Sequence, residues 1–398
     1  MAQVINTNVM SLNAQRNLNS SANSLATSVQ RLSSGLRINS AKDDAAGLAI
    51  SERFTTQIRG LDVAIRNAND GISLSQTAEG AMVEVSNNLQ RIRELAVQAA
   101  NATNSASDRK ALQAEVTQLI NEMGRVASQT NFNNINLLDG SFTGAQFQVG
   151  ANAGETISIN TIVNTKPSVM GKTTFHLAEI DKGTSTITSI AHPTEANKAG
   201  YSEVAAKQIT LNNVTIDVPA LPASANNAYA SGDAAAAGEK AYGALLAASI
   251  NARSTDTGII AEDLGNGNVK LTQVKGDSEI TGDIKTGTKS SIDKVVSDFD
   301  ITTPAGAQMA ILMADKALES VNASRADMGA IQNRFQSTIA NLTTTSENLS
   351  ASRSRIRDAD YAKETAELTR TQILQQAGTA MLAQANSLPN SVLSLLQQ

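Results

Sequence analysis

Residues 304–356, PAGAQMAILMADKALESVNASRADMGAIQNRFQSTIANLTTTSENLSASRSRI, carry the spacing that decides the fold. From Ala307 onward, seam residues recur at alternating steps of four and three, which predicts one face of a long helix over about seven heptads. Pro304 fits the first position of this helix, where its missing N–H needs no partner. The polar members of the seam lower stability but help to fix register. The seam residues are Ala307, Ile311, Ala314, Leu318, Val321, Arg325, Met328, Gln332, Phe335, Ile339, Leu342, Ser346, Leu349, Arg353 and Ile356.

Both ends of the chain carry similar helical patterns. Near the amino terminus a seam with the same spacing precedes a polar break at residues 37–47, and near the carboxyl terminus residues 362–388 form a helix pattern that ends at Pro389. We predict that these two terminal helices pair, because each is marginal alone. As a pair they remain a thin layer with exposed apolar flanks, so we expect them to become ordered only when copies of the chain pack together. The predicted polymerisation seam consists of Leu18, Leu25, Val29, Leu32, Leu36, Leu374, Ala377, Met381 and Leu388.

Helical patterning also fills residues 54–126. Two seams, in 54–72 and 78–96, are out of phase by one residue, and Asn69-Asp70-Gly71 between them is typical of a turn. The pattern therefore leaves open whether one helix or two occupy this stretch. A further helix is predicted over 112–126, preceded by a capping box of Ser105 and Asp108.

The period changes to that of β-structure after residue 131. Alternating apolar residues on both sides of the Gly150–Gly154 turn predict a β-hairpin over 147–159. Between 166 and 302 the sequence predicts a hairpin at 208–218, a helix at 233–250 and a strand at 269–274. We therefore expect a mainly α protein, a long antiparallel helical bundle or coiled coil of the two terminal segments, with a β-hairpin and an inserted α+β outer domain.

Composition excludes several classes of function. A net charge of −5 argues against a nucleic-acid binder, and the absence of cysteine removes disulfides, thiol nucleophiles and cysteine metal sites. His176 and His192 are the only histidines, which leaves little for a metal site or a histidine base. No apolar run is long enough to span a membrane. Residues 1–15 lack the regions of a cleaved secretory signal, so we expect either retention in the cytoplasm or export without cleavage.

Motifs at both ends strongly resemble those of bacterial flagellins. The resemblance covers about 1–160 and 304–398, whereas the middle matches only loosely. It implies that the helix continues through Asn69-Asp70-Gly71. It also implies an inner-core domain (1–43 with 357–398), a helical bundle domain with the hairpin (44–165 with 303–356) and a variable outer domain (166–302). The motifs are Asn39–Gly47, Asn67–Ile72, Leu89–Val97, Phe147–Gly150, Gly329–Phe335, Arg355–Tyr361, Gln372–Gly378 and Val392–Leu396.

The resemblance also implies a function. A flagellin is a non-enzymatic subunit without cofactors that polymerises into an extracellular filament for swimming, and it leaves the cell through the flagellar type III apparatus with its amino terminus uncleaved. Its implied partners are other copies of itself, an export chaperone, the filament cap and the hook-associated junction proteins. An innate Toll-like receptor of hosts is a further implied partner, through Gln90, Arg91, Leu95 and Glu115. We expect Leu95 to be an exposed anchor beside Arg91, although a solvated surface explains the same residues.

Other readings of the sequence have less support. Residues 170–174 resemble half of a phosphate-binding loop, but Lys166 stands where the first glycine is needed. The sequence after His192 lacks the second histidine of a zinc protease. The alternative functions are a hook–filament junction protein, a host-binding adhesin that uses the outer domain, and a secreted enzyme with helical export ends.

Overall fold

The computed structural model describes residues 7–180, 189–191, 198–224, 229–230, 233–275, 279–284 and 289–396 of the chain. The chain divides into two compact units, which we call the terminal and the central unit. The terminal unit comprises Met1–Asp70, Gln146–Ile157 and Arg334–Gln398. The central unit comprises Gly71–Ala145 and Ser158–Asn333.

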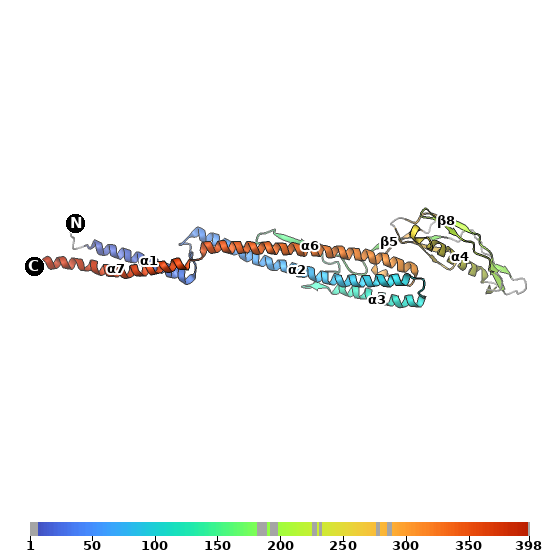
Figure 1. Cartoon of the computed structure of the whole chain (residues 1–398), viewed down its shortest axis with the longest axis horizontal. Coiled ribbons are helices and arrows are strands. Elements are labelled where there is room, and N and C mark those ends of the chain that lie inside the picture. Colours follow the sequence, from blue (N-terminus) through green and yellow to red (C-terminus); the bar gives the residue numbers. More distant parts are fainter. Residues whose placement is uncertain are drawn as a thin grey trace. The chain divides into compact units, whose positions relative to one another are not determined.

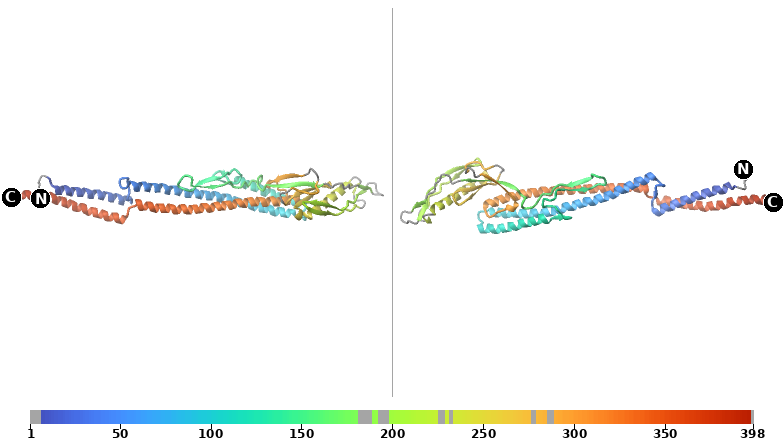
Figure 2. Two further views of the ribbon diagram at one scale, coloured as in Figure 1. Left: turned by 90° about the horizontal axis from the view of Figure 1, so that it is seen from above. Right: turned by 180° about the vertical axis from the view of Figure 1, so that it is seen from behind.

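Two helices from opposite ends of the chain pair in the terminal unit. They are α1 (Val9–Ser34) and α7 (Tyr361–Leu396), which lie side by side (Figures 1 and 2). Asn8 caps α1 by accepting a hydrogen bond from the Ser11 N–H, and Gly35 ends the helix with a φ of 70°. The predicted pairing of the terminal helices is confirmed.

The carboxyl-terminal helix extends further than the sequence suggested. We predicted that it ends at Pro389, but α7 continues to Leu396, so that boundary is wrong. A proline removes one backbone hydrogen bond and favours a bend, but it does not by itself oblige a helix to stop.

Two long helices run through both units. They are α2 (Ala45–Ala100) and α6 (Pro304–Arg357), and each is continuous. The question raised by Asn69-Asp70-Gly71 is thus settled in favour of one helix. Ala68 and Leu74 are buried on either side of the tripeptide, so the apolar face continues through it and overrides the local turn preference. Within the terminal unit these helices share a small cluster of Leu61, Ala64 and Leu342.

A third helix joins them in the central unit. This helix, α3 (Ala106–Gln129), lies beside α2 (Figures 1 and 2), and its predicted capping box of Ser105 and Asp108 is confirmed. It is followed by a two-residue hairpin, β1 (Asn131–Phe132) and β2 (Ile135–Asn136), whose turn residues Asn133 and Asn134 have positive φ. Asparagine tolerates this left-handed conformation better than most residues.

The predicted hairpin after residue 145 is also present. It consists of β3 (Ala145–Gln148) and β4 (Thr156–Ile159), paired as a two-stranded sheet. Within the terminal unit Phe147 packs edge-on against Phe335 of α6, with ring centroids 5.7 Å apart. The Asn67 side chain donates a hydrogen bond to the Gln148 carbonyl at 3.0 Å, which ties the hairpin to α2.

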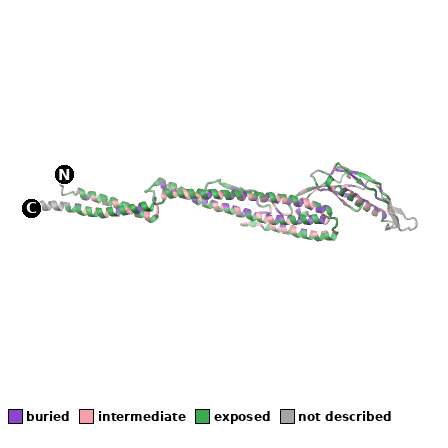
Figure 3. Cartoon of the chain, in the orientation of Figure 1, coloured by how far each residue is buried: buried purple, intermediate pink, exposed green. Residues whose placement is uncertain are grey.

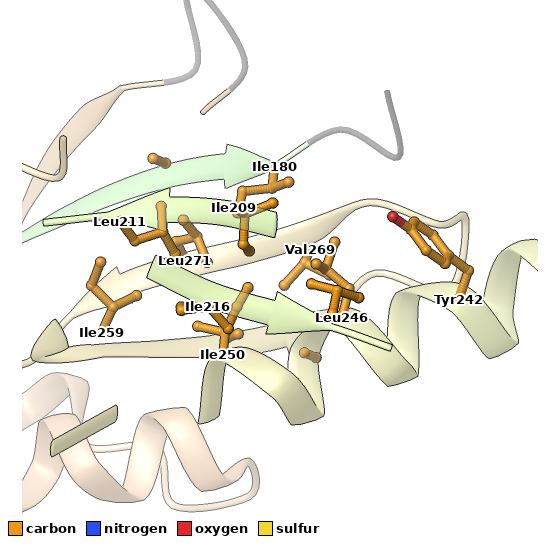
Figure 4. Packing of buried hydrophobic residues seen from close by; sticks show 14 of the residues in the cluster. Ile180, Ile209, Leu211, Ile216, Tyr242, Leu246, Ile250, Ile259, Val269 and Leu271 are labelled. Atoms are coloured by element: carbon orange, nitrogen blue, oxygen red, sulfur yellow. The ribbon is translucent and has the colours of Figure 1, made fainter. Parts of the chain in front are cut away.

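The inserted α+β module belongs to the central unit and confirms the predicted elements. Its hairpin β8–β9 turns at Asn212-Asn213, both with positive φ, and the helix α4 packs against strands over one apolar cluster (Figure 4). A four-stranded antiparallel sheet has the order β11-β12-β5-β13. The elements are β5 (Thr173–Ile180), β6 (Ser189–Ala191), β7 (Lys198–Tyr201), β8 (Lys207–Leu211), β9 (Val214–Val218), β10 (Tyr229–Ala230), α4 (Ala234–Asn251), α5 (Ser254–Thr257), β11 (Ile259–Asp263), β12 (Val269–Gln273), β13 (Ser290–Lys294) and a 3₁₀ turn at Val296–Asp298.

Candidate assembly surface

Three contacts define how α1 and α7 lie against each other. The Asn8 side-chain amide donates to the Ala385 carbonyl at 2.8 Å, and Arg31 Nη1 lies 3.2 Å from Glu364 Oε1. Between them Leu18 packs on Gly378, where an added Cβ would lie 3.2 Å from Leu18 Cδ1. Residue numbers rise along α1 while those of the contacted residues on α7 fall. The two helices are therefore antiparallel and keep one register along the pair.

The seam between these helices is unusually polar. Its buried members in the described part of the chain are Ser11, Ser28, Glu364, Thr371 and Ala385, of which only the alanine is apolar. The predicted seam residues Leu18, Leu25, Leu32 and Leu36 are half-buried. Because burial of apolar area is the main source of stability, this pair contributes little to the folding of a single copy.

One predicted seam residue of α1 points elsewhere. Val29 is 50% exposed, so its assignment to the face that pairs with α7 is wrong. In the structure that face alternates leucine with small residues at Ala14, Ser21 and Ser28. These positions recur every seven residues, one residue before the row that contains Val29. The periodicity of the sequence is the same for both rows, so it did not show which of them faces α7.

The predicted stripe on α7 also faces away from α1. Leu374 is 44% exposed, Met381 is 65% exposed and Ala377 is exposed, whereas the α1 side of α7 is formed by Thr371, Gly378 and Ala385. The small residues allow the helices to approach closely, which explains why the larger stripe was not selected for this contact. Leu388 lies outside the residues whose side chains the structure describes.

The terminal helices expose large apolar side chains. Most of the described length of both helices is coloured as exposed in Figure 3. A scattered exposed leucine is ordinary, but repeated large apolar side chains along two paired helices indicate an interaction surface. These side chains, which we call the outer stripe, are Val9, Met10, Leu12 and Val29 in several directions around α1, and Ile373, Leu374 and Met381 on α7, where Leu374 and Met381 share one face.

A compact joint ends the α1–α7 pair at residues 35–44 and 357–360. The Ala359 N–H donates to the Gly35 carbonyl at 2.9 Å, and the Arg37 N–H donates to the Arg357 carbonyl at 2.6 Å. On the α1 side, Asp43 accepts hydrogen bonds from the backbone N–H groups of Ser40 and Asn39, which hold its pKa below the ordinary value. The backbone bonds of Ala359 and Arg37 connect the segment that follows α1 to the segment that precedes α7.

A separate polar patch on the central unit contains most of the predicted receptor-binding residues. Arg91 Nε donates to Glu115 Oε1 at 2.9 Å and Arg91 Nη1 to Glu94 at 3.0 Å, so α2 and α3 are bridged on the surface. Hydrogen bonding to Glu115, then to Glu94, raises the pKa of Arg91. Gln90 and Glu115 are also exposed. The sequence did not indicate the role of Glu94.

Leu95 does not fit that patch. It is 1% exposed, so the expectation of an exposed anchor is wrong. Heptad spacing within the seam of 78–96 places Leu95 outside the stripe of Leu89, Ile92 and Ala96, and that stripe is fully buried. Because both α3 and α6 cover α2 in this region, its buried face is wider than one heptad seam and also includes Leu95.

Other candidate chemical features have structural explanations or no supporting geometry. Gly171 of the incomplete phosphate-loop motif has a φ of 67°, and an added Cβ would lie 2.8 Å from the Met313 carbonyl, so glycine permits a close approach to α6. His176 lines a pocket of about 180 Å³ with Glu279 and Lys289. His192 lies outside the described residues. Over the described ranges, acidic and histidine side chains do not cluster as three or more metal ligands. Within those same ranges, every helix is too short or too polar to cross a membrane.

The structure shows a mainly helical chain whose two terminal helices pair, and comparisons with known proteins identify its family. Models of the bacterial flagellin N-terminal and C-terminal helical regions match residues 5–143 and 311–396. Polar flagellin C of Vibrio parahaemolyticus is 44% identical over 407 residues, and flagellin B of Vibrio cholerae is 41% identical over 404 residues, with 100% of both chains covered in each case. The chain belongs to the bacterial flagellin family, whose members are structural subunits of the flagellar filament.

A solved structure is also similar over part of the chain. The structure of FliC from Burkholderia pseudomallei is 28% identical, and the match covers 66% of this chain and 99% of that chain with a TM-score of 0.37. The family assignment rests on the sequence matches.

Proposed function

We propose that copies of this chain polymerise through the outer stripe of α1 and α7. The observation that carries the proposal is the contrast between a polar internal seam and large exposed apolar side chains on the same helix pair. In water that arrangement leaves apolar area uncovered, and a second copy that covers it supplies the stability that the pair lacks. Assembly and ordering of the terminal helices are then one process.

The proposed places of the three domains in the polymer follow the domain boundaries that the sequence suggests. Residues 1–43 and 357–398 line the inner core of the polymer, 44–165 and 303–356 form the tube around it, and 166–302 project outwards. The continuity of α2 and α6 supports this proposal, because continuous helices transmit load without a hinge of their own. The polymer transmits motor torque for swimming.

Substitution of the outer stripe tests polymerisation. Leu374→Asp and Met381→Asp place charges where a neighbour must cover an apolar side chain, so each should abolish sedimentable filaments after salting-out. Gln376→Asp is the matched control, because Gln376 is an exposed polar residue of the same helix. Circular dichroism of the variants checks that the central helices remain folded. Filaments formed normally by both stripe variants contradict the proposal.

We also propose that the surface of Gln90, Arg91 and Glu115 is recognised by a host Toll-like receptor, with Leu95 supporting it from beneath. An exposed arginine already oriented by two carboxylates is a pre-organised contact for a partner. Arg91→Ala should reduce activation of receptor-bearing cells by monomer. Arg125→Ala, which breaks an exposed ion pair with Glu122 on α3, is the control. Equal activation by the wild type and both variants refutes this role.

Export and partner binding complete the proposal. We infer that the chain is exported by the flagellar type III route without cleavage of its amino terminus, and that it meets an export chaperone, the filament cap and the hook-associated junction proteins. Amino-terminal sequencing of shed filaments tests the first point. Abundance in those filaments separates a major filament subunit from a junction protein, and cell binding after deletion of the outer domain tests the adhesin alternative.

A further inference from the structure

The seam between α1 and α7 repeats in a way that leaves its register ambiguous. On α1 the half-buried leucines recur every seven residues, at Leu18, Leu25 and Leu32. On α7 the facing positions repeat with the same period as Glu364, Thr371, Gly378 and Ala385. A slide of one helix by seven residues therefore keeps leucines opposite mainly small residues, and packing alone distinguishes the registers poorly.

The ionic and polar contacts do distinguish them. In the slide that brings Leu18 opposite Ala385, Arg31 faces Thr371 and loses its contact with Glu364. In the opposite slide, which brings Leu18 opposite Thr371, Glu364 lies opposite Ser24 and loses its cation on α1. Glu364 is 8% exposed, and a buried carboxylate without a partner is strongly unfavourable.

The joint does not by itself prevent a slide of α1. Its backbone bonds at Gly35 and Arg37 oppose one, but residues 35–44 between α1 and α2 are long enough to absorb about 10 Å of movement, which is the rise of seven helical residues. A groove of about 480 Å³ lies beside Arg31 and is lined by Asn23, Thr27 and Lys363.

We propose that Arg31 and Glu364 are positioning residues that select the register of the α1–α7 pair. The selected register fixes the level along the pair at which Val29 of α1 and the exposed side chains of α7 meet a second copy. This inference rests on the proposed polymerisation, to which it adds the device that makes the surface uniform from copy to copy. The Asn8–Ala385 bond supports the same register at the other end of the pair.

Disulfide cross-linking reads this register directly, because the natural chain contains no cysteine. A full-length reporter with Leu18→Cys and Gly378→Cys detects the observed register. Reporters that combine Leu18→Cys with Thr371→Cys or Ala385→Cys detect the two slipped registers. Each reporter is oxidised in sedimented polymer and in monomer, and gel mobility separates intramolecular from intermolecular products.

The proposal predicts a specific change in these yields. Glu364→Gln should raise the yield of a slipped reporter at least several-fold relative to the observed-register reporter, and the charge exchange of Arg31→Glu with Glu364→Arg should restore the original ratio. Arg370→Gln, which breaks the exposed pair with Glu367 on the same helix, should leave the ratio unchanged.

Two results overturn the inference. Unchanged yields with Glu364→Gln show that the backbone bonds of the joint set the register alone, and failure of the charge exchange to restore the ratio shows that charge pairing is not the cause. Failure of the proposed polymerisation is a separate result, since it appears as absence of sedimentable polymer in the natural chain, which carries neither a reporter cysteine nor a register substitution.

Discussion

At the scale of single residues, Leu95 shows how a surface role and a core role are separated. Its side chain is 1% exposed while Arg91, one turn earlier, is exposed. Leu95→Ala should therefore lower the free energy of unfolding of the central helices by about 2–5 kcal/mol, because it leaves a cavity in the core. Arg91→Ala should change it by less than about 1 kcal/mol. Thermal unfolding followed by circular dichroism measures both, and a neutral Leu95→Ala contradicts the buried assignment.

The carboxylate of Asp139 leads to a prediction of how the stability of the fold depends on pH. Hydrogen bonds from the Ser141 hydroxyl and N–H, and a further bond from Asn136, lower the pKa of Asp139 from 3.8 to about 2. A lowered pKa in the folded state means that the carboxylate stabilises the fold above pH 3.8 and loses that contribution as the pH falls towards 2. Asp139→Asn should thus destabilise the chain at pH 6 more than at pH 2. Unfolding midpoints at the two pH values test this, and an equal shift at both counts against it.

At the scale of elements, two glycines of long helices should respond in opposite ways. Gly378 of α7 lies under Leu18, and its added Cβ would sit 3.2 Å from Leu18 Cδ1, whereas Gly329 of α6 has no such neighbour within 4 Å. Gly378→Val should separate α1 from α7 and raise the protein concentration needed for polymerisation. Gly329→Ala should instead raise the stability of the monomer by about 0.5–1 kcal/mol, because glycine is a poor helix residue.

Sedimentation after salting-out and thermal unfolding of dilute monomer read these two effects separately. Met381→Ala on the outer stripe of α7 serves as a comparison for Gly378→Val, because it removes exposed apolar area without adding bulk between the helices. Normal polymerisation of Gly378→Val would show that the contact with Leu18 does not position α1.

The elements also show which parts of the fold were accessible from sequence. The stripe of Leu89, Ile92 and Ala96, the capping box of α3 and the turn of β8–β9 were predicted, because heptad spacing and asparagine turns are local signals. The faces of α1 and α7 were not, because which of two adjacent stripes meets the partner depends on how closely the helices approach. The distance between the helices depends on both of them together, so the periodicity of α1 or of α7 alone does not give it.

At the scale of the whole molecule, stability should be distributed unevenly along the chain. The central unit buries large side chains such as Met82, Leu89 and Phe175 completely, whereas the α1–α7 pair buries mainly serine, threonine and the carboxylate of Glu364. Local opening free energy follows the apolar area that an element buries. In dilute monomer, the amides of α1 and α7 should therefore exchange with solvent close to the unprotected rate, while those of α2 and α3 in the central unit exchange slowly.

Polymerisation should reverse this difference. Once a second copy covers Val29, Leu374 and Met381, opening α1 or α7 requires that their apolar area return to water, so their amides should become protected by at least tenfold in sedimented polymer. Hydrogen exchange with mass spectrometry of the two states measures the change, and the central helices serve as the internal control. Strong protection of α1 and α7 already in dilute monomer would mean that the pair folds without neighbours, and the coupling of folding to assembly would then be wrong.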